Sequence, residues 1–122
     1  MSMYIDVATF LKKMKIETNS KPTLLTDENV KMRYRHLLEE SEELLTAHND
    51  QDLEGCVDAL IDVIYVALGT AKMMGLSTKQ FERCFHRVHS ANMDKYAGDI
   101  TDHKVGVKKP VGWKSPNFKD IL

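Results

Sequence analysis

A chain of 122 residues, 43% hydrophobic and 29% charged, has the size and composition of one globular domain with one core. Its formal net charge of −1 disfavours nucleic-acid polymers and membrane surfaces as partners, since both select chains with a large excess of Lys and Arg. Cys56 and Cys84 lack CxxC spacing, and no signal-peptide pattern or membrane-length apolar run occurs. We therefore expect a cytoplasmic protein with two buried free thiols.

Helical periodicity dominates the chain from its start, and no convincing strand pattern precedes the tail. The first helix is expected over residues 5–15, with Val7 and Leu11 among the apolar residues of one face. The loop that follows contains Pro22, which prevents a helix from continuing through it. Thr26 is a good N-cap with acidic residues in the turn after it, so it predicts a second helix that runs to about residue 48.

An acidic residue in the next turn, Asp50 or Asp52, predicts the N-cap of a third helix. Gly75 predicts the end of that helix. A fourth helix is expected over about residues 77–96. The Gly and Pro residues of the remaining segment, residues 97–122, predict an irregular tail. The whole chain is therefore expected to form one all-α domain with an extended tail.

Three glutamates lie within one turn of the second predicted helix. In the segment "EESEE", Glu39 and Glu43 are four residues apart and Glu40 and Glu43 are three apart, so the side chains share one face. The leucines that flank this segment fall on another face. Taken alone, this pattern fits a solvated acidic face as well as a binding site.

The third predicted helix is apolar on nearly all sides except for one acidic stripe. Glu54, Asp58 and Asp62 are spaced four residues apart, and Tyr65 continues the stripe, where it either packs or donates to a carboxylate. Burying an unpaired carboxylate is costly, so the stripe faces water, pairs with Lys or Arg of another helix, or binds a cation. A helix that is apolar all round is a central one, and in so short a chain we expect a second copy to cover part of it.

The two acidic clusters are more informative together than apart. Helices joined by a short turn pack antiparallel, which brings both acidic faces to matching heights. Several carboxylates at one place repel each other unless divalent cations bind between them, and all-oxygen ligands suit Mg²⁺ or Mn²⁺. A di-iron centre is disfavoured, because the Glu-x-x-His pairs that it needs are absent. The two acidic clusters together therefore predict a divalent metal site between these helices.

A magnesium site in a small helical bundle favours phosphate chemistry. The metal would bridge phosphate oxygens and polarise a water for attack. A carboxylate that is not saturated by metal would then serve as general base.

These acidic segments resemble the motifs of a known group of enzymes. "LLEESEELL" and "DALIDVIYVALGTA" resemble the E-E-x-x-E and E-x-x-D motifs of the all-α nucleoside triphosphate pyrophosphohydrolases, the MazG-like and phosphoribosyl-ATP pyrophosphohydrolase-like group. Asp62 takes the Asp position, whereas the motif Glu falls at Ala59, and Asp58 is expected to replace it. "VHSANMDK" and "VKKPVGWKSPNF" resemble the stand-alone phage and bacterial members.

The resemblance implies a bundle of four to five helices, completed by a homodimer or homotetramer. It also implies Mg²⁺ dependence and cleavage of a nucleoside triphosphate or deoxynucleoside triphosphate to monophosphate and pyrophosphate. The glutamates of the first motif, Glu39, Glu40 and Glu43, would be catalytic as well as metal-binding. Asp58 and Asp62 would be the metal ligands from the second motif. Within this class, dUTP or dCTP hydrolysis competes with phosphoribosyl-ATP and with a broad range of nucleotides.

The resemblance also places substrate contacts on the fourth helix, with Asn92 on base or sugar and Lys95 on a phosphate. Lys108 and Arg35 are further candidates for the phosphates. Each has a plainer alternative: an ordinary surface pair for Asn92 and Lys95, and a pairing with a neighbouring Glu for Arg35. Trp113, near Lys108, either caps a base or anchors the tail to a bundle.

A rival function is a non-catalytic oligomeric helical module that binds nucleotides or serves as a scaffold. Its best argument is Ala59 at the position of the motif Glu. Pyrophosphate release from a panel of nucleotides, with and without Mg²⁺, would separate the two functions.

Overall fold

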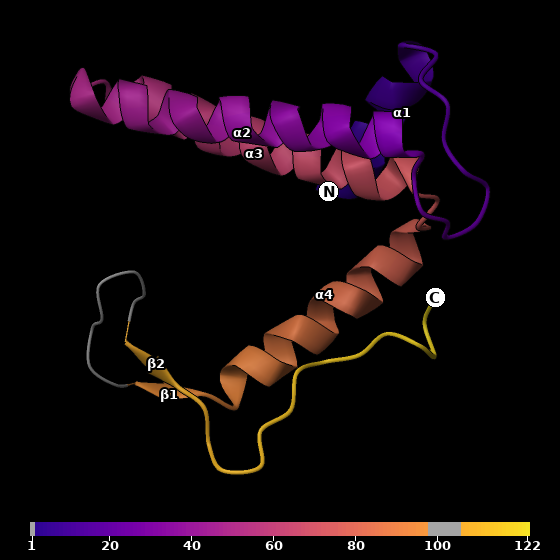
Figure 1. The fold of residues 1–122 in the computed structure, drawn as a ribbon, viewed down its shortest axis with the longest axis vertical. Helices are drawn as coiled ribbons and strands as arrows, with labels where there is room; N and C mark the ends of the chain where they lie inside the picture. The colour runs from indigo at the N-terminus through magenta and orange to yellow at the C-terminus, as the bar shows by residue number, and fades with distance from the viewer. Residues whose placement is uncertain (1, 98–105) are drawn as a thin grey trace. The chain divides into compact units, whose positions relative to one another are not determined.

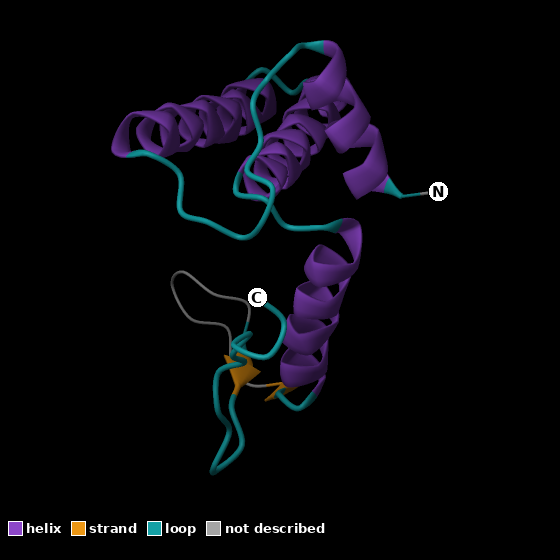
Figure 2. Ribbon diagram, turned by 90° about the vertical axis from the view of Figure 1, so that its right-hand side faces the viewer, coloured by secondary structure: helices purple, strands orange, loops and turns teal. Residues whose placement is uncertain are grey.

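The computed structural model describes residues 2–97 and 106–122, and helices dominate them (Figures 1 and 2). The all-α class expected from the sequence is confirmed. None of the described helices is long and apolar enough to cross a membrane. The elements are α1 (Met3–Lys13), α2 (Asp27–Asn49), α3 (Leu53–Met73), α4 (Thr78–Met93), β1 (Tyr96–Ala97) and β2 (Val107–Lys108).

The chain divides into two compact units, Met1–Thr78 and Lys79–Leu122. The first unit contains α1, α2 and α3, and the second contains α4, β1, β2 and the tail after them. A single domain that covers the whole chain stays a prediction.

Local capping signals set the helix boundaries of the first unit. The Thr26 hydroxyl accepts a hydrogen bond from the Asn29 amide at 3.2 Å, as predicted for an N-cap of α2. At the start of α3, Asp52 rather than Asp50 is the cap, and it accepts from the Gly55 amide at 2.9 Å. α3 ends just before Gly75, whose φ of 95° is the left-handed conformation expected of a glycine after a helix.

The buried core of the first unit includes side chains of α1 and α3, which pack against each other. Tyr4 is buried there, and its hydroxyl donates to the Leu76 carbonyl oxygen at 2.7 Å. Tyr65 packs edge-to-face on Phe10 with 5.5 Å between ring centroids, which confirms packing as its role. The buried apolar residues are Tyr4, Val7, Leu11, Ala59, Val66, Leu68 and Met73.

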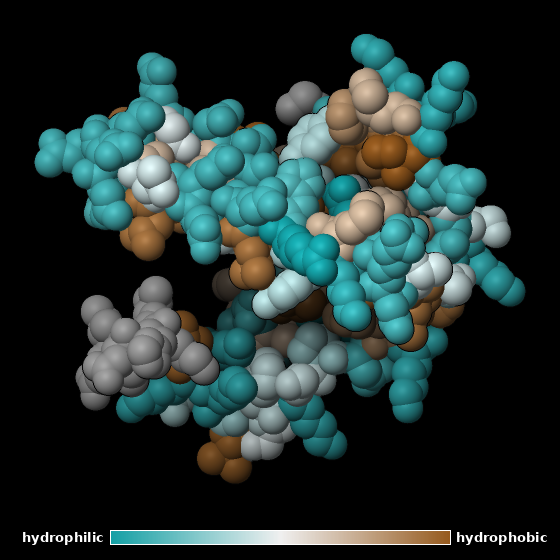
Figure 3. Space-filling model, turned by 45° about the horizontal axis from the view of Figure 1, so that its top comes forward, coloured by the Kyte–Doolittle hydropathy of each residue, from teal (hydrophilic) through white to brown (hydrophobic). Residues whose placement is uncertain are grey.

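Apolar side chains of α2 and α3 also reach the surface. Along the predicted apolar face of α3, Leu68 is buried but the residues before it are exposed: Leu53, Val57, Leu60, Ile61 and Ile64. Figure 3 shows such apolar atoms among hydrophilic ones on the side that faces the viewer. One chain therefore covers only part of α3, and its completion by a second copy stays a prediction.

The second unit differs from its prediction at the end of α4. The helix stops at Met93, earlier than expected, and Tyr96–Ala97 then pairs antiparallel with Val107–Lys108. The prediction of a wholly irregular tail is therefore wrong at this strand pair. The part of the predicted tail at 98–105 lies outside the described residues.

After β2 the chain runs back along α4 and is tied to it by hydrogen bonds. Arg87 donates to the Asn117 carbonyl oxygen at 3.0 Å and forms an ion pair with Asp120. Gln80 donates to the Ile121 carbonyl oxygen at 3.1 Å. The hydrogen bond from Arg87 lowers the pKa of Asp120, so the pair stays charged and holds the end of the chain on α4.

Candidate metal centre

Two helices supply the carboxylates of the candidate site. α2 and α3 lie side by side along their length (Figure 1). Glu40 and Glu43 of α2 and Asp62 of α3 each offer one oxygen, and these three oxygens lie within 4.8 Å of one another. The spacing of "EESEE" and the antiparallel pairing of the helices thus bring acidic side chains of both motifs to one point.

Glu40 is largely buried, with its side chain only 13% exposed. Its Oε2 atom is buried, and no described residue donates a hydrogen bond to it. A buried carboxylate oxygen without a donor is costly, and a bound cation would remove that cost. This unsatisfied atom belongs to one of the three carboxylates that meet here, so it fits a divalent cation.

The surroundings of Glu40 also change its protonation. Burial raises the pKa of Glu40, and the neighbouring carboxylates of Glu43 and Asp62 raise it further. A hydrogen bond with His36 acts in the opposite direction. Without a cation, the group therefore resists carrying its full negative charge.

His36 is part of this site, although its spacing to other histidines gave no hint of it. Its Nε2 atom lies 3.2 Å from Glu40 Oε1, one helical turn along α2. The signal present in the sequence was the spacing of four residues between a His and a Glu. The ring therefore holds one oxygen of Glu40 and leaves the other for a ligand.

Two predicted metal ligands lie outside the group of three. Glu39 and Asp58 are both exposed, and neither is among the described carboxylates that meet within 4.8 Å. Ala59, at the position of the motif Glu, is 2% exposed and so faces the interior. The roles of Glu39 and Asp58 in metal binding stay predictions.

Arg33 of α2 connects this helix to α3 through hydrogen bonds, at a position beyond the carboxylates. Its Nε atom donates to the Thr70 hydroxyl and its Nη2 atom to the Val66 carbonyl oxygen, both at 3.0 Å. Burial lowers the pKa of Arg33. The guanidinium thus bonds to α3. Arg35 is exposed and its predicted contact with phosphate stays a prediction.

The predicted substrate residues of the second unit lie near one another. Lys95 Nζ donates to Asn92 Oδ1 at 2.9 Å and lies 4.8 Å from the centre of the Trp113 ring. Trp113 Nε1 donates to the Ala91 carbonyl oxygen at 2.8 Å, so this side chain anchors the tail to α4. Lys108 is exposed on β2, opposite Tyr96. Contact of these residues with a substrate stays a prediction.

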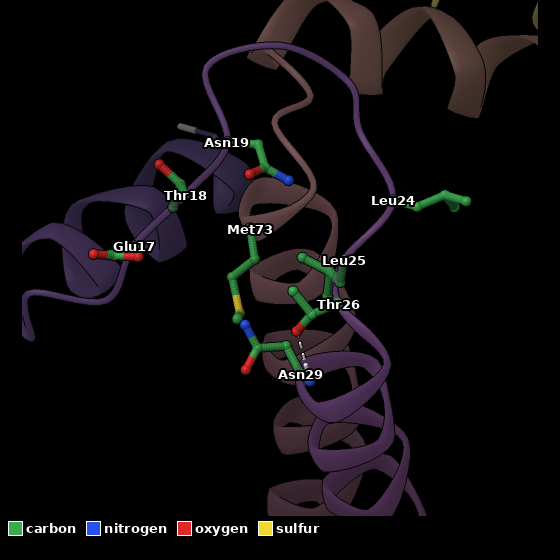
Figure 4. A pocket seen from close by; sticks show the side chains of 8 residues that line it. All are labelled: Glu17, Thr18, Asn19, Leu24, Leu25, Thr26, Asn29 and Met73. Carbon is green, nitrogen blue, oxygen red and sulfur yellow. Dashed lines mark hydrogen bonds between the residues drawn. The ribbon is translucent and has the colours of Figure 1, made fainter.

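A pocket of about 320 Å³ opens at the start of α2 (Figure 4). The loop before α2 lines it with polar side chains, and Met73 of α3 forms part of its wall. The carboxylates of the candidate metal centre are not among its lining residues: Glu17, Thr18, Asn19, Leu24, Leu25, Thr26, Asn29 and Met73.

An all-α fold in which two adjacent helices bring carboxylates to one point is typical of the MazG-like pyrophosphohydrolases. Residues 7–92 match the family model described as phosphoribosyl-ATP pyrophosphohydrolase, and the chain belongs to this family. The resemblance drawn from the sequence is thereby confirmed, and the class of enzyme is a pyrophosphohydrolase. No curated protein matches the chain. The family match ends before Lys95 and the tail.

Proposed function

We propose that this protein hydrolyses a nucleoside triphosphate to a nucleoside monophosphate and pyrophosphate, with a divalent cation at Glu40, Glu43 and Asp62. The observation that carries the proposal is the buried Oε2 atom of Glu40, which has no donor among the described residues and lies in a group of three carboxylates. Family membership supports the same reaction class.

Mg²⁺ suits an all-oxygen ligand set, and Mn²⁺ would be its closest substitute. When bound, the cation would neutralise phosphate charge and polarise the attacking water. Glu39 directly precedes Glu40, and Asp58 lies one helical turn before Asp62. Both are exposed, so they are available to complete the coordination.

In the proposed reaction, a water oxygen bonds to a phosphorus and the bridging bond to the pyrophosphate group breaks. Glu39 is the candidate to accept the proton of the water, because its carboxylate lies outside the group of three and is exposed. Lys95, Lys108 and Arg35 would bind phosphate oxygens, and Asn92 would bind the base or sugar.

Among substrates, we propose a deoxynucleoside triphosphate such as dUTP or dCTP in preference to phosphoribosyl-ATP. The basis is the part of the chain after the family match. It contains Lys95, Trp113 and a tail tied to α4, and it resembles the stand-alone members of the group.

A homodimer or homotetramer is part of the proposal. The exposed apolar residues of α3, Leu53 to Ile64, would be covered by a second copy. Sedimentation equilibrium tests this directly, and a monomer at micromolar concentration would contradict it.

The decisive experiment measures pyrophosphate release from the four canonical dNTPs, dUTP and phosphoribosyl-ATP, with Mg²⁺ and with EDTA. We expect release that requires Mg²⁺ and is fastest with dUTP or dCTP. A folded oligomer that releases pyrophosphate from none of them would favour the non-catalytic module, for which Ala59 remains the best argument. Release from phosphoribosyl-ATP alone would support a pyrophosphohydrolase but contradict dUTP or dCTP as the substrate.

A further inference from the structure

The second unit contains two ammonium groups on one indole ring. Lys95 Nζ lies 4.8 Å and Lys109 Nζ 4.7 Å from the centre of the Trp113 ring. Lys95 lies between α4 and β1 and Lys109 in the segment after β2, so the ring joins two parts of the unit that are apart in sequence. Attraction between a cation and an aromatic face stabilises each contact.

Neither ammonium group has a carboxylate partner among the described residues. The ion pairs described in this unit belong to Asp120, which binds Arg87 and Arg83. Two cations near one ring repel each other, and nothing described neutralises them. An anion that lies against both ammonium groups would relieve this repulsion.

The balance of charge along the chain points in the same direction. Residues 79–122 contain nine Lys and Arg against five Asp and Glu, whereas residues 1–78 contain eight against thirteen. Residues 79–122 are therefore basic, although the net charge of the whole chain is −1. A basic surface raises the local concentration of anions around it.

The cluster is also held in place before any ligand arrives. Trp113 is fixed through Nε1 to the Ala91 carbonyl oxygen at 2.8 Å, and Lys95 is fixed through Nζ to Asn92 at 2.9 Å. Because the ring and one ammonium group are already oriented, less conformational freedom is lost on binding. An anion with two adjacent phosphoryl groups offers one charged group to each ammonium, whereas a single phosphate offers only one.

We infer that Lys95 and Lys109, held on Trp113, form a binding site for a pyrophosphate group, either free or as the terminal part of a nucleoside triphosphate. The natural ligand rests on the proposed function, but pyrophosphate binding itself does not require catalysis. The inference adds Lys109 and Trp113 to the residues expected to contact substrate, and both lie outside the family match.

Trp113 is the only tryptophan in the sequence, so its fluorescence reports on this site. The full chain is titrated with sodium pyrophosphate in EDTA, which removes divalent cations, and with orthophosphate and dUTP in parallel. We expect a saturable change of emission with pyrophosphate and dUTP, and at least tenfold weaker binding of orthophosphate. Calorimetry of the same titrations gives a second reading that does not depend on the fluorophore.

Substitution of single lysines tests the residues. Lys109→Gln and Lys95→Gln are each expected to weaken pyrophosphate binding at least fivefold, with the helical circular dichroism unchanged. Lys119→Gln is the matched control, because this exposed tail lysine makes no described contact with Trp113. Equal losses in all three variants, or no saturable response of the wild type, would overturn the inference.

This test separates the inference from the proposed function. Pyrophosphate binding that depends on Lys109, in a protein that hydrolyses no nucleotide, would leave the site standing and remove the proposed function. If Lys109→Gln hydrolysed nucleotides with an unchanged KM and bound pyrophosphate as the wild type does, the proposed function would stand and the pyrophosphate site would be wrong.

Discussion

Arg33 of α2 bonds to α3 beside Gly69. Its Nη2 atom lies 3.0 Å from the Val66 carbonyl oxygen, and a Cβ atom built on Gly69 would lie 2.8 Å from the same nitrogen. The next neighbour, Val7, would be at an ordinary contact distance of 3.6 Å. The absence of a side chain at Gly69 therefore leaves room for the partly buried guanidinium of Arg33.

Gly69→Ala tests this relationship. A Gly to Ala change inside a helix normally stabilises it by about 0.5–1 kcal/mol. Here the new methyl group displaces Arg33 Nη2 from its hydrogen bond to Val66, and one bond to a charged group contributes about 1.5–3 kcal/mol. We expect a net loss of about 1–2 kcal/mol in urea unfolding.

The control is the same change in an Arg33→Met background. Without the guanidinium, Gly69→Ala should be neutral or stabilising, because only the helix propensity remains. Equal effects of Gly69→Ala in both backgrounds would show that Arg33 is not the reason why position 69 requires a glycine.

Gly75 is predicted to be among the least replaceable residues of the first unit. Its φ is 95°, and a Cβ atom there would overlap the carbonyl oxygen of Lys21, which belongs to the backbone and cannot easily move. Gly75→Ala should therefore cost at least about 3 kcal/mol in the free energy of unfolding.

Gly112 provides the matched comparison for Gly75. It also has a positive φ, 81°, but a Cβ atom there meets nothing within 4 Å. Gly112→Ala should cost about 1 kcal/mol, the price of the conformation alone. Thermal unfolding of both variants checks the difference, and equal losses would contradict a role for the contact with Lys21.

Tyr4 makes the stability of the first unit depend on alkaline pH. Burial raises the pKa of Tyr4 to about 12 from 10.0, so the folded state favours the neutral phenol. Its contribution is complete below pH 10 and is lost as the pH rises from 10 toward 12.

Tyr4→Phe is the variant that isolates this contribution. The variant loses the hydrogen bond to Leu76, at a cost of about 1 kcal/mol at neutral pH. Above pH 10 the wild type should lose stability faster than the variant, as measured by urea unfolding. Parallel curves over this range would show that the phenol titrates without affecting the fold.

Much of this fold could be predicted because the signals are local. Thr26, Asp52 and Gly75 act within one turn of their own helices, and the spacing of "EESEE" fixes which carboxylates share a face. Short-range patterns of this kind need no knowledge of the rest of the chain. They are sufficient to predict that Glu40, Glu43 and Asp62 lie near one another, as they do in the structure.

The parts that could not be predicted depend on residues far apart in sequence. The pairing of Tyr96–Ala97 with Val107–Lys108 requires the chain to return, and strands of two residues carry no periodicity. Arg33 bonds to Thr70, and nothing in the local sequence of α2 indicates that partner. Apolar periodicity likewise marks a face without saying whether this chain or another covers it.

His36 is predicted to position Glu40 for metal binding. Partners of this kind typically contribute 10–100-fold to metal affinity, so we expect His36→Ala to weaken Mn²⁺ binding by about tenfold or more. His36→Gln keeps a donor and should retain part of the affinity.

Calorimetric titration with Mn²⁺ measures these affinities, with His48→Ala as a control on the same helix. His48 is exposed near the end of α2 and makes no described contact with Glu40. An unchanged Mn²⁺ affinity in His36→Ala would mean that the hydrogen bond to Glu40 has no part in binding.

Glu43→Gln tests the metal centre itself. The substitution keeps the shape of the side chain on α2 and removes one of the three charges that meet within 4.8 Å. We expect it to abolish pyrophosphate release, with a loss of at least about a hundredfold, because a ligand should matter more than its hydrogen-bonding partner. Glu42→Gln is the matched control, since Glu42 is the exposed neighbour outside the group. Circular dichroism should show equal helicity in both variants, and the rise in Tm on adding Mn²⁺ should vanish only in Glu43→Gln. Full activity in Glu43→Gln would remove that carboxylate from the site, whereas equal losses in both variants would indicate a general effect of charge on this helix.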